Sequence, residues 1–388
     1  MRAVLAVNIG YSPRHAASPL GPGSVPPRRG PRTVIIVLGI VAAVSAAASL
    51  AVIRAMRQPT AGCRPIALHL TCGDAADGPV TPARVYTGRV FGLRRPAGAA
   101  AAGGRLWITN SAGDSVTEID LRSPEHPVVW TGPRYGFSAP GPIVAAVGGV
   151  WVANTLANTV TELNAESGNV MRRITHVPSA NSLMLLRNRL WVASGQGNSV
   201  RVFDAGTGTL VKNLRRCGFS EPSALAVSHG RIWVANQRSS TVTVIDAVTG
   251  AWKATLRPAN FGFGQPTAEV ASRTRLWVAN SARGTITEIS TVTSRRVLTI
   301  AGGPYHLDFP VALALDGRDL WVADALGDSV TEIDAATGRL VRVLSGRAYH
   351  FDHPSAIASY RGRIWVTNAD SGSVTELEPG QARRGTAR

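Results

Sequence analysis

The chain has 388 residues, long enough for two or three domains, with 41 basic against 24 acidic residues and a formal net charge of +17 at pH 7. The charge does not indicate nucleic-acid binding, because seven arginines lie in the first 57 residues and three more between Arg383 and Arg388. Lipid headgroups or anionic envelope polymers suit the remaining excess better than DNA. The sequence contains no Gly-rich phosphate loop, Cys-x-x-Cys pair, Ser-centred nucleophile elbow or His-Glu-x-x-His helix.

Residues 1–33 are rich in Pro, Gly and Arg, which predicts a disordered tail. Residues 34–53, which begin at Val34 and end at Ile53, carry no charge. A helix of that length spans about 30 Å, the thickness of a bilayer's hydrocarbon core. The arginines before it favour a cytoplasmic N-terminus. We therefore expect a single-pass signal-anchor helix with the rest of the chain outside the cytoplasm.

Two alternatives stay open for this segment. Small residues at Ala46, Ala48 and Ala51 could serve a signal peptidase and release a secreted protein. Residues 60–63, which end at Cys63, weakly resemble a lipoprotein processing site. All three interpretations place the remaining chain in an extracytoplasmic compartment.

Residues 54–79 form a predicted stalk, in which Cys63 and Cys72 flank an eight-residue loop and could form a local disulfide in an oxidising compartment. Cys217 is left without a partner. We expect it to be a small buried residue and not a reactive thiol.

From about residue 80 a tryptophan phrase recurs seven times, followed by a Val/Ile-rich phrase and usually an Asp-x-x-Thr-Gly turn. The successive spacings are 44, 40, 42, 44, 44 and 44 residues, and the tryptophans are Trp107, Trp151, Trp191, Trp233, Trp277, Trp321 and Trp365. In the fourth repeat, residues 223–227, 231–236, 241–245 and 251–256 are four predicted strands joined by turns. This period predicts an all-β, seven-bladed β-propeller with the tryptophans packed between blades.

The last repeat stops at Glu378-Pro379-Gly380, before its fourth strand. Residues 84–96 match residues 342–354 at an offset of 258, which is also the separation of Trp107 and Trp365. We therefore expect residues around 80–87 to supply the outer strand of blade seven, which would leave no open edge. The propeller would span residues 80–380, and residues 381–388 would be a basic disordered tail.

The phrases Leu-Trp-Val-Ala-Asn at 276–280 and Ser-Val-Thr-Glu-Ile-Asp-Ala-Ala-Thr-Gly-Arg-Leu-Val at 329–341 resemble the YVTN-type repeats of bacterial extracytoplasmic and surface-layer propellers. The resemblance covers residues 80–380 and implies a secreted or envelope-associated protein. A more distant likeness is to the streptogramin lyase type of seven-bladed propeller, which is a metal-dependent enzyme. The sequence offers no convincing counterpart of the catalytic His-Glu-His set of that family, so this activity is not carried over.

The connections between blades share an aromatic-x-aromatic-x-x-Pro pattern, which we expect to wedge rings between blades. The polar residues inside the connections are not repeated, and they gather before blades six, seven and one. Two His and a carboxylate suit Zn²⁺, Fe²⁺ or Mn²⁺, and a His/Asp pair suits acid–base chemistry, whereas solvated loop residues are the plain alternative. The candidate ligand-binding residues are His306, Asp308, His350, Asp352, His353, Arg94 and Arg95.

A glutamate recurs in five third strands, at positions 118, 162, 288, 332 and 376. We expect these carboxylates to pair with the arginines that open second strands, Arg105, Arg231, Arg275 and Arg363.

Taken together, these features predict a monomeric, membrane-anchored extracytoplasmic propeller that is a binding or scaffolding module for a cell-envelope protein, polymer or small ligand. No cofactor, metal or nucleic acid is expected, and no catalytic residue is assigned. The alternative is a metal-dependent lyase or hydrolase that uses the His/Asp residues of the connections into blades six and seven.

Overall fold

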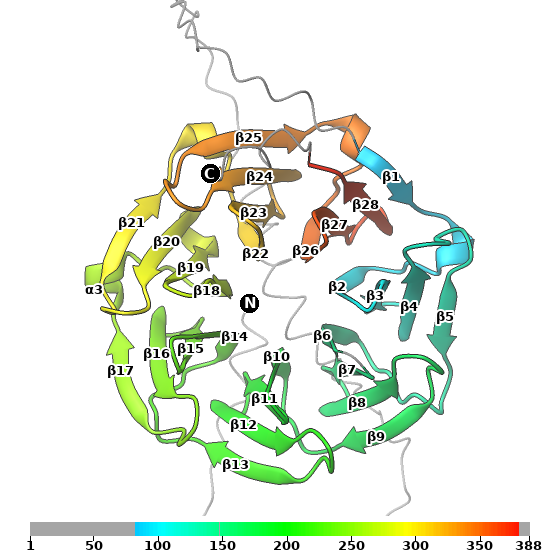
Figure 1. Ribbon diagram of the computed structural model, residues 1–388, viewed down its shortest axis with the longest axis horizontal. Helices are drawn as coiled ribbons and strands as arrows, with labels where there is room; N and C mark the ends of the chain where they lie inside the picture. Colours follow the sequence, from blue (N-terminus) through cyan, green and yellow to red (C-terminus); the bar gives the residue numbers. More distant parts are fainter. Residues whose placement is uncertain (1–81, 147, 380–388) are drawn as a thin grey trace, which may run out of the picture. The chain divides into compact units, whose positions relative to one another are not determined.

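The computed structural model describes residues 82–146 and 148–379, and these residues form seven four-stranded antiparallel sheets around one axis (Figure 1). Blades one to four contain β2 (Pro96–Ala102), β3 (Arg105–Asn110), β4 (Ser115–Asp120) and β5 (Val128–Thr131); β6 (Pro140–Ala146), β7 (Gly149–Asn154), β8 (Thr159–Asn164) and β9 (Val170–Ile174); β10 (Ala180–Leu186), β11 (Arg189–Ser194), β12 (Ser199–Asp204) and β13 (Leu210–Leu214); and β14 (Pro222–Ser228), β15 (Arg231–Asn236), β16 (Thr241–Asp246) and β17 (Trp252–Leu256).

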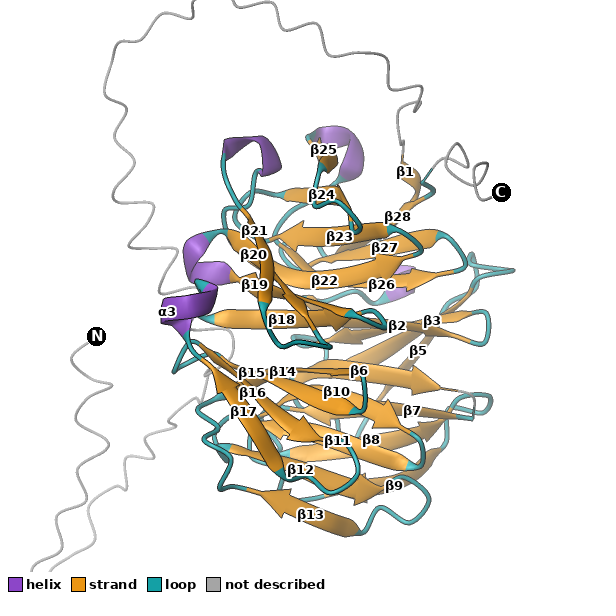
Figure 2. Cartoon of the chain, turned by 60° about the vertical axis from the view of Figure 1, so that its left-hand side comes forward, coloured by secondary structure: helices purple, strands orange, loops and turns teal. Residues whose placement is uncertain are grey.

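Blades five to seven contain β18 (Pro266–Ala271), β19 (Arg275–Asn280), β20 (Thr285–Ser290) and β21 (Arg296–Ile300); β22 (Pro310–Asp316), β23 (Asp319–Asp324), β24 (Ser329–Asp334) and β25 (Leu340–Ser345); and β26 (Pro354–Tyr360), β27 (Arg363–Asn368), β28 (Ser373–Leu377) and β1 (Pro82–Tyr86). Short helical turns occupy connections near the outer strands (Figure 2): η2 (Arg89–Phe91), α3 (Pro258–Phe261), η4 (Gly303–Tyr305) and η5 (Arg347–Tyr349). A further turn, η3 (Ser281–Arg283), lies between the second and third strands of blade five and contacts the inner strand β18.

The core lies between neighbouring blades. Second and third strands are almost wholly buried, and apolar clusters join each sheet to the next. The seven repeat tryptophans are at most 3% exposed, which confirms the prediction that they pack between blades. The aromatic side chains of the connections between blades also pack in these clusters, where Phe261 stacks on Phe263 and Tyr349 stacks on Phe351. First strands surround the axis and stay partly exposed.

Ring closure occurs as predicted. β1 pairs antiparallel with β28, with Val85 opposite Thr375 and Tyr86 opposite Val374. Tyr86 is buried, and its hydroxyl donates to Glu376 Oε2 at 2.5 Å. Burial and this carboxylate raise the pKa of the Tyr86 phenol. The inner strands close as well, because Ser355 Oγ donates to the Pro96 carbonyl of blade one at 2.7 Å.

The five repeated glutamates are structural. Arg105, Arg275 and Arg363 pair with Glu118, Glu288 and Glu376, as expected from the sequence. In blades two and six the second strand opens with Gly149 and Asp319 instead, and the outer strand supplies the partner: Arg172 pairs with Glu162 and Arg342 with Glu332. Arg231 faces no glutamate and bonds the hairpin of blade five.

The predicted anchor at 34–53, the stalk cysteines Cys63 and Cys72, and the tail at 381–388 lie outside the described residues. Within residues 82–146 and 148–379, no helix is long and apolar enough to cross a membrane. Cys217 is half-buried against the cluster between blades three and four, and burial raises the pKa of its thiol. It packs against this cluster, and the raised pKa disfavours the thiolate, the reactive form of the side chain.

Candidate functional site

The residues before each first strand are fixed by backbone hydrogen bonds to the loop between the second and third strands of the same blade. In blade one the amides of Ser111 and Ala112 donate to the carbonyls of Arg95 and Arg94, at 3.1 and 3.2 Å. In blade seven the amides of 369 and 370 donate to the carbonyls of 353 and 352, at 3.1 and 3.3 Å. These connections and loops therefore lie together on one face of the ring, called the connection face below.

A second repeated bond links neighbouring blades on this face. The side chain of the residue before the third strand accepts the backbone amide of the residue just before the next blade's first strand, as when Asp328 Oδ1 accepts the His353 amide at 2.8 Å. The same bond recurs from Asp114, Asn158, Asn198 and Ser240. One framework thus displays a different side chain in each blade, namely Arg95, Ala139, Ser179, Glu221, Gln265, Phe309 and His353.

Four of the seven sequence-predicted residues meet on the connection face between blades seven and one. Asp352 and His353 lie beside Asp370, and Arg95 Nη2 is 3.7 Å from Asp370 Oδ1. The pKa of Asp352 is raised, first by partial burial and then by the negative charges of Asp328 and Asp370, while His353 opposes the shift. Arg94 precedes Arg95 on the same exposed segment. Three carboxylates, those of Asp328, Asp352 and Asp370, are therefore close together here.

Asp308 lies one blade away, beside Asp324 at the end of β23. Burial raises the pKa of Asp324 to about 6, and the negative charge of Asp308 adds to the shift. The amides of Phe309 and Gly327 donate to the Asp324 carboxylate, at 2.8 and 2.7 Å. Five other blades carry asparagine at this position, whose amide donates to hydroxyls of the third strand. Asp324 therefore replaces the donating amide of these blades with a carboxylate that accepts backbone amides.

His306 and His350 lie four residues before β22 and β26, in the predicted sector of blades six, seven and one, but at a different backbone position from His353. Both have positive φ, 49° and 55°, and end the turns η4 and η5 beside the outer strands. Blades one, two, four and five carry glycine there, at 92, 136, 218 and 262. The turns that these residues end contact the outer strand β25, and η5 also contacts β1. No group of three His, Cys, Asp or Glu residues in the described part is arranged to hold a metal.

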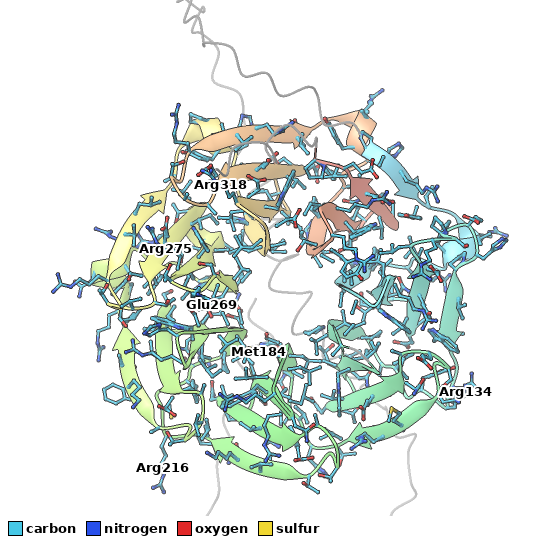
Figure 3. All side chains as sticks on the ribbon, viewed as in Figure 1. Arg134, Met184, Arg216, Glu269, Arg275 and Arg318 are labelled. Atoms are coloured by element: carbon cyan, nitrogen blue, oxygen red, sulfur yellow. The ribbon has the colours of Figure 1, made fainter. Side chains whose placement is uncertain are left out.

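Glu269 is a residue that the sequence reasoning missed. It lies on the inner strand β18, opposite Val278, on the face whose neighbours Leu276 and Val278 pack against blade four (Figure 3). Both carboxylate oxygens are buried without a well-formed hydrogen bond. Burial raises the pKa of Glu269 well above its ordinary value, and the Ala235 backbone amide offsets this only in part. Every other blade has an apolar residue at this register: Ala99, Ile143, Leu183, Leu225, Leu313 and Ile357.

The architecture defines a seven-bladed β-propeller. No protein-family model and no curated protein matches the chain. Solved structures with similar folds include virginiamycin B lyase from Staphylococcus aureus, 15% identical with a TM-score of 0.60 over 73% of this chain and 94% of that one. A streptogramin B lyase is 15% identical with a TM-score of 0.62 over 74% and 94%, and the WD40 propeller domain of Doa1 is 13% identical with a TM-score of 0.62 over 79% and 99%.

At these identities the similarity establishes the fold alone. The repeats resemble those of the YVTN-type family, but no family model matches the chain, so the assignment to that family stays a prediction.

Proposed function

We propose that this chain is a binding propeller of the bacterial cell envelope, anchored through residues 34–53. Its connection face over blades seven and one would hold a cationic group of a protein or polymer partner. The crowding of Asp328, Asp352 and Asp370 carries the proposal. A bound ammonium or guanidinium group would relieve the repulsion between these like charges.

The side-chain carboxylates of Asp352 and Asp370 take no part in the backbone hydrogen bonds that fix the connection face. Asp352 and Asp370 take part in the framework through backbone atoms, so their side chains are available to a partner. Asp370 is half-exposed and faces Arg95 at 3.7 Å, a distance typical of a weak surface pair. A stronger cationic ligand could therefore compete with Arg95 for Asp370 at small cost to the fold.

The test is binding of a fluorescent oligolysine peptide to the full-length protein, followed by anisotropy. Asp352→Asn and Asp370→Asn, made as separate variants, should each weaken binding about fivefold. Binding should strengthen as the pH rises through the raised pKa of Asp352, because only the ionised carboxylate attracts the peptide. Glu166→Gln, an exposed change in a hairpin of blade two, is the charge-matched control. Equal affinities in all three proteins would refute the proposal.

The alternative function, a metal-dependent lyase or hydrolase, has the fold similarity behind it but no assembled ligand set among the described residues. Its test is elemental analysis with thermal melting in EDTA. A stoichiometric metal and a chelator-sensitive melt that disappears in the triple Ala variant of His306, His350 and His353 would favour the enzyme.

A further inference from the structure

A second surface lies on the outer rim of blades three, four and five. There the hairpins between third and fourth strands, and the first residues of β13, β17 and β21, expose large apolar side chains. Six of the ten such side chains in the described residues gather here: Leu210, Val211, Val248, Trp252, Val292 and Val297. Together with Lys212, Lys253, Arg295 and Arg296 they are called the basic–apolar rim below.

The rim is continuous from blade to blade. Lys212 Nζ donates to the carbonyls of Val248 and Thr249 in the next hairpin, at 3.0 and 2.7 Å. Arg231 of blade four donates to Ser294 Oγ in the hairpin of blade five, at 3.1 Å. β13, β17 and β21 are the consecutive outermost strands of this part of the ring (Figure 1). The apolar side chains therefore belong to one surface.

The charge of the rim is positive. Asp246 lies 3.5 Å from Lys253, and the turn amides of Val248 and Thr249 hold its pKa at about 2. It is therefore ionised and offsets one of the four positive charges, which leaves an excess of three. Asp204, the other carboxylate near these hairpins, is bonded to Arg189. In the hairpin of blade five, between β20 and β21, Arg295 and Arg296 have no acidic residue beside them in the sequence.

Trp252 gives the rim an amphipathic anchor. It is 55% exposed, and its indole Nε1 donates to Thr255 Oγ1 at 3.0 Å, which ties the polar end of the ring to the strand. Val248, on the preceding turn, is 67% exposed. A tryptophan and short apolar side chains next to Lys and Arg are typical of protein surfaces that settle into the headgroup region of a bilayer.

We propose that the basic–apolar rim docks on a bilayer surface that contains anionic lipids. Lys253, Arg295 and Arg296 would meet lipid phosphates, while Val248 and Trp252 enter the headgroup layer. A second copy of the chain fits less well, because a two-fold contact would bring the same positive charges together. The predicted anchor favours the same occupant, since residues 54–81 reach at most about 100 Å when extended.

Docking through this rim would leave the carboxylate cluster free. Blades seven and one lie across the ring from blade four (Figure 1), so Asp352 and Asp370 would remain accessible to a partner. The rim proposal is independent of the cationic-ligand proposal, because it rests on different residues and a different ligand.

The test uses the full-length protein with vesicles of phosphatidylcholine, alone or mixed with phosphatidylglycerol, whose acyl chains carry bromine as a tryptophan quencher. Only the mixed vesicles should quench strongly. Trp252→Phe should remove most of the quenching, because the seven repeat tryptophans are buried and the ninth, Trp130, lies on β5 of blade one, away from the rim. Changing Lys253, Arg295 and Arg296 to Gln should weaken docking on the order of 100-fold, about fivefold for each charge.

The matched control changes Arg89, Arg122 and Arg347 to Gln, which removes the same charge from exposed positions near blades seven and one. This variant should retain the Trp252 quenching. Equal loss in both triple variants, or no quenching that depends on Trp252, would overturn the proposal. The oligomeric state should also be measured by light scattering. If the wild-type protein is a dimer and the triple variant of Lys253, Arg295 and Arg296 is a monomer, the rim binds a second copy of the chain, and the bilayer proposal is wrong.

Discussion

Replacement of Glu269 by Leu should stabilise the propeller. The carboxylate is buried between blades four and five without a well-formed hydrogen bond, and such a group costs about 1–3 kcal/mol. Blades three, four and six already hold leucine at this register, so the space between blades suits that side chain. With the added apolar contact, we expect a gain of about 2–4 kcal/mol. This corresponds to a rise in Tm of about 3–6 °C for a domain of this size.

The gain should depend on pH. Since the folded-state pKa of Glu269 is raised, the wild-type protein loses stability as the pH rises from the ordinary glutamate range towards the raised value. Calorimetry at pH 4.5 and pH 8 should therefore show a larger advantage of the variant at pH 8. Glu269→Gln is the control, because it removes the titration but keeps a buried polar group. A lower Tm for Glu269→Leu, or an advantage independent of pH, would refute the reasoning.

Three further changes test other parts of the molecule. Deletion of Pro82–Tyr86 should destabilise the ring by at least about 3–5 kcal/mol, the usual loss for one buried aromatic side chain, and an unchanged melting curve would contradict closure through β1. Asp324→Asn should raise the free energy of unfolding by about 3 kcal/mol at pH 7 and by little at pH 4, because the raised pKa of about 6 makes the wild-type protein lose stability as the pH rises over that interval. Thermal melts at a series of pH values measure this difference, and a variant less stable than wild type at pH 7 would contradict the prediction. His306→Gly and His350→Gly should leave Tm unchanged or slightly raised, since glycine accepts the positive φ at these turns, and a clear loss of stability would assign the imidazoles an unseen structural contact.

The period of the repeat was sufficient to predict the fold. Because each blade buries both faces, the seven tryptophan phrases and their apolar neighbours recur at one spacing, and the offset between residues 84–96 and 342–354 identified the strand that closes the ring. The partners of the repeated glutamates were predicted only where an arginine opens the second strand. Arg172 and Arg342 act across the third-to-fourth-strand register, which no single repeat makes plain.

The candidate site was predicted less completely, for a reason of backbone geometry. Proximity in sequence placed His306 and His350 with Asp352 and His353, but a left-handed turn position holds both imidazoles near the outer strands. The glycines of four other blades at this position were the available signal. Glu269 had a signal too, because aligning the first strands shows one carboxylate among six apolar residues. Its burial became apparent only when the register fixed the face on which it lies.

Closure through β1 also affects how the protein is made. The first strand of the ring finds its partner about 290 residues later in the chain, as the Tyr86–Glu376 bond shows. At about 5–20 residues per second, a ribosome needs about 15–60 s to synthesise that interval. During this time β1 has no partner strand, and an unpaired strand invites association with other chains. A nascent chain that ends before β28 leaves β1 unpaired and the ring open, so the last strand to be made is also the one that completes the fold.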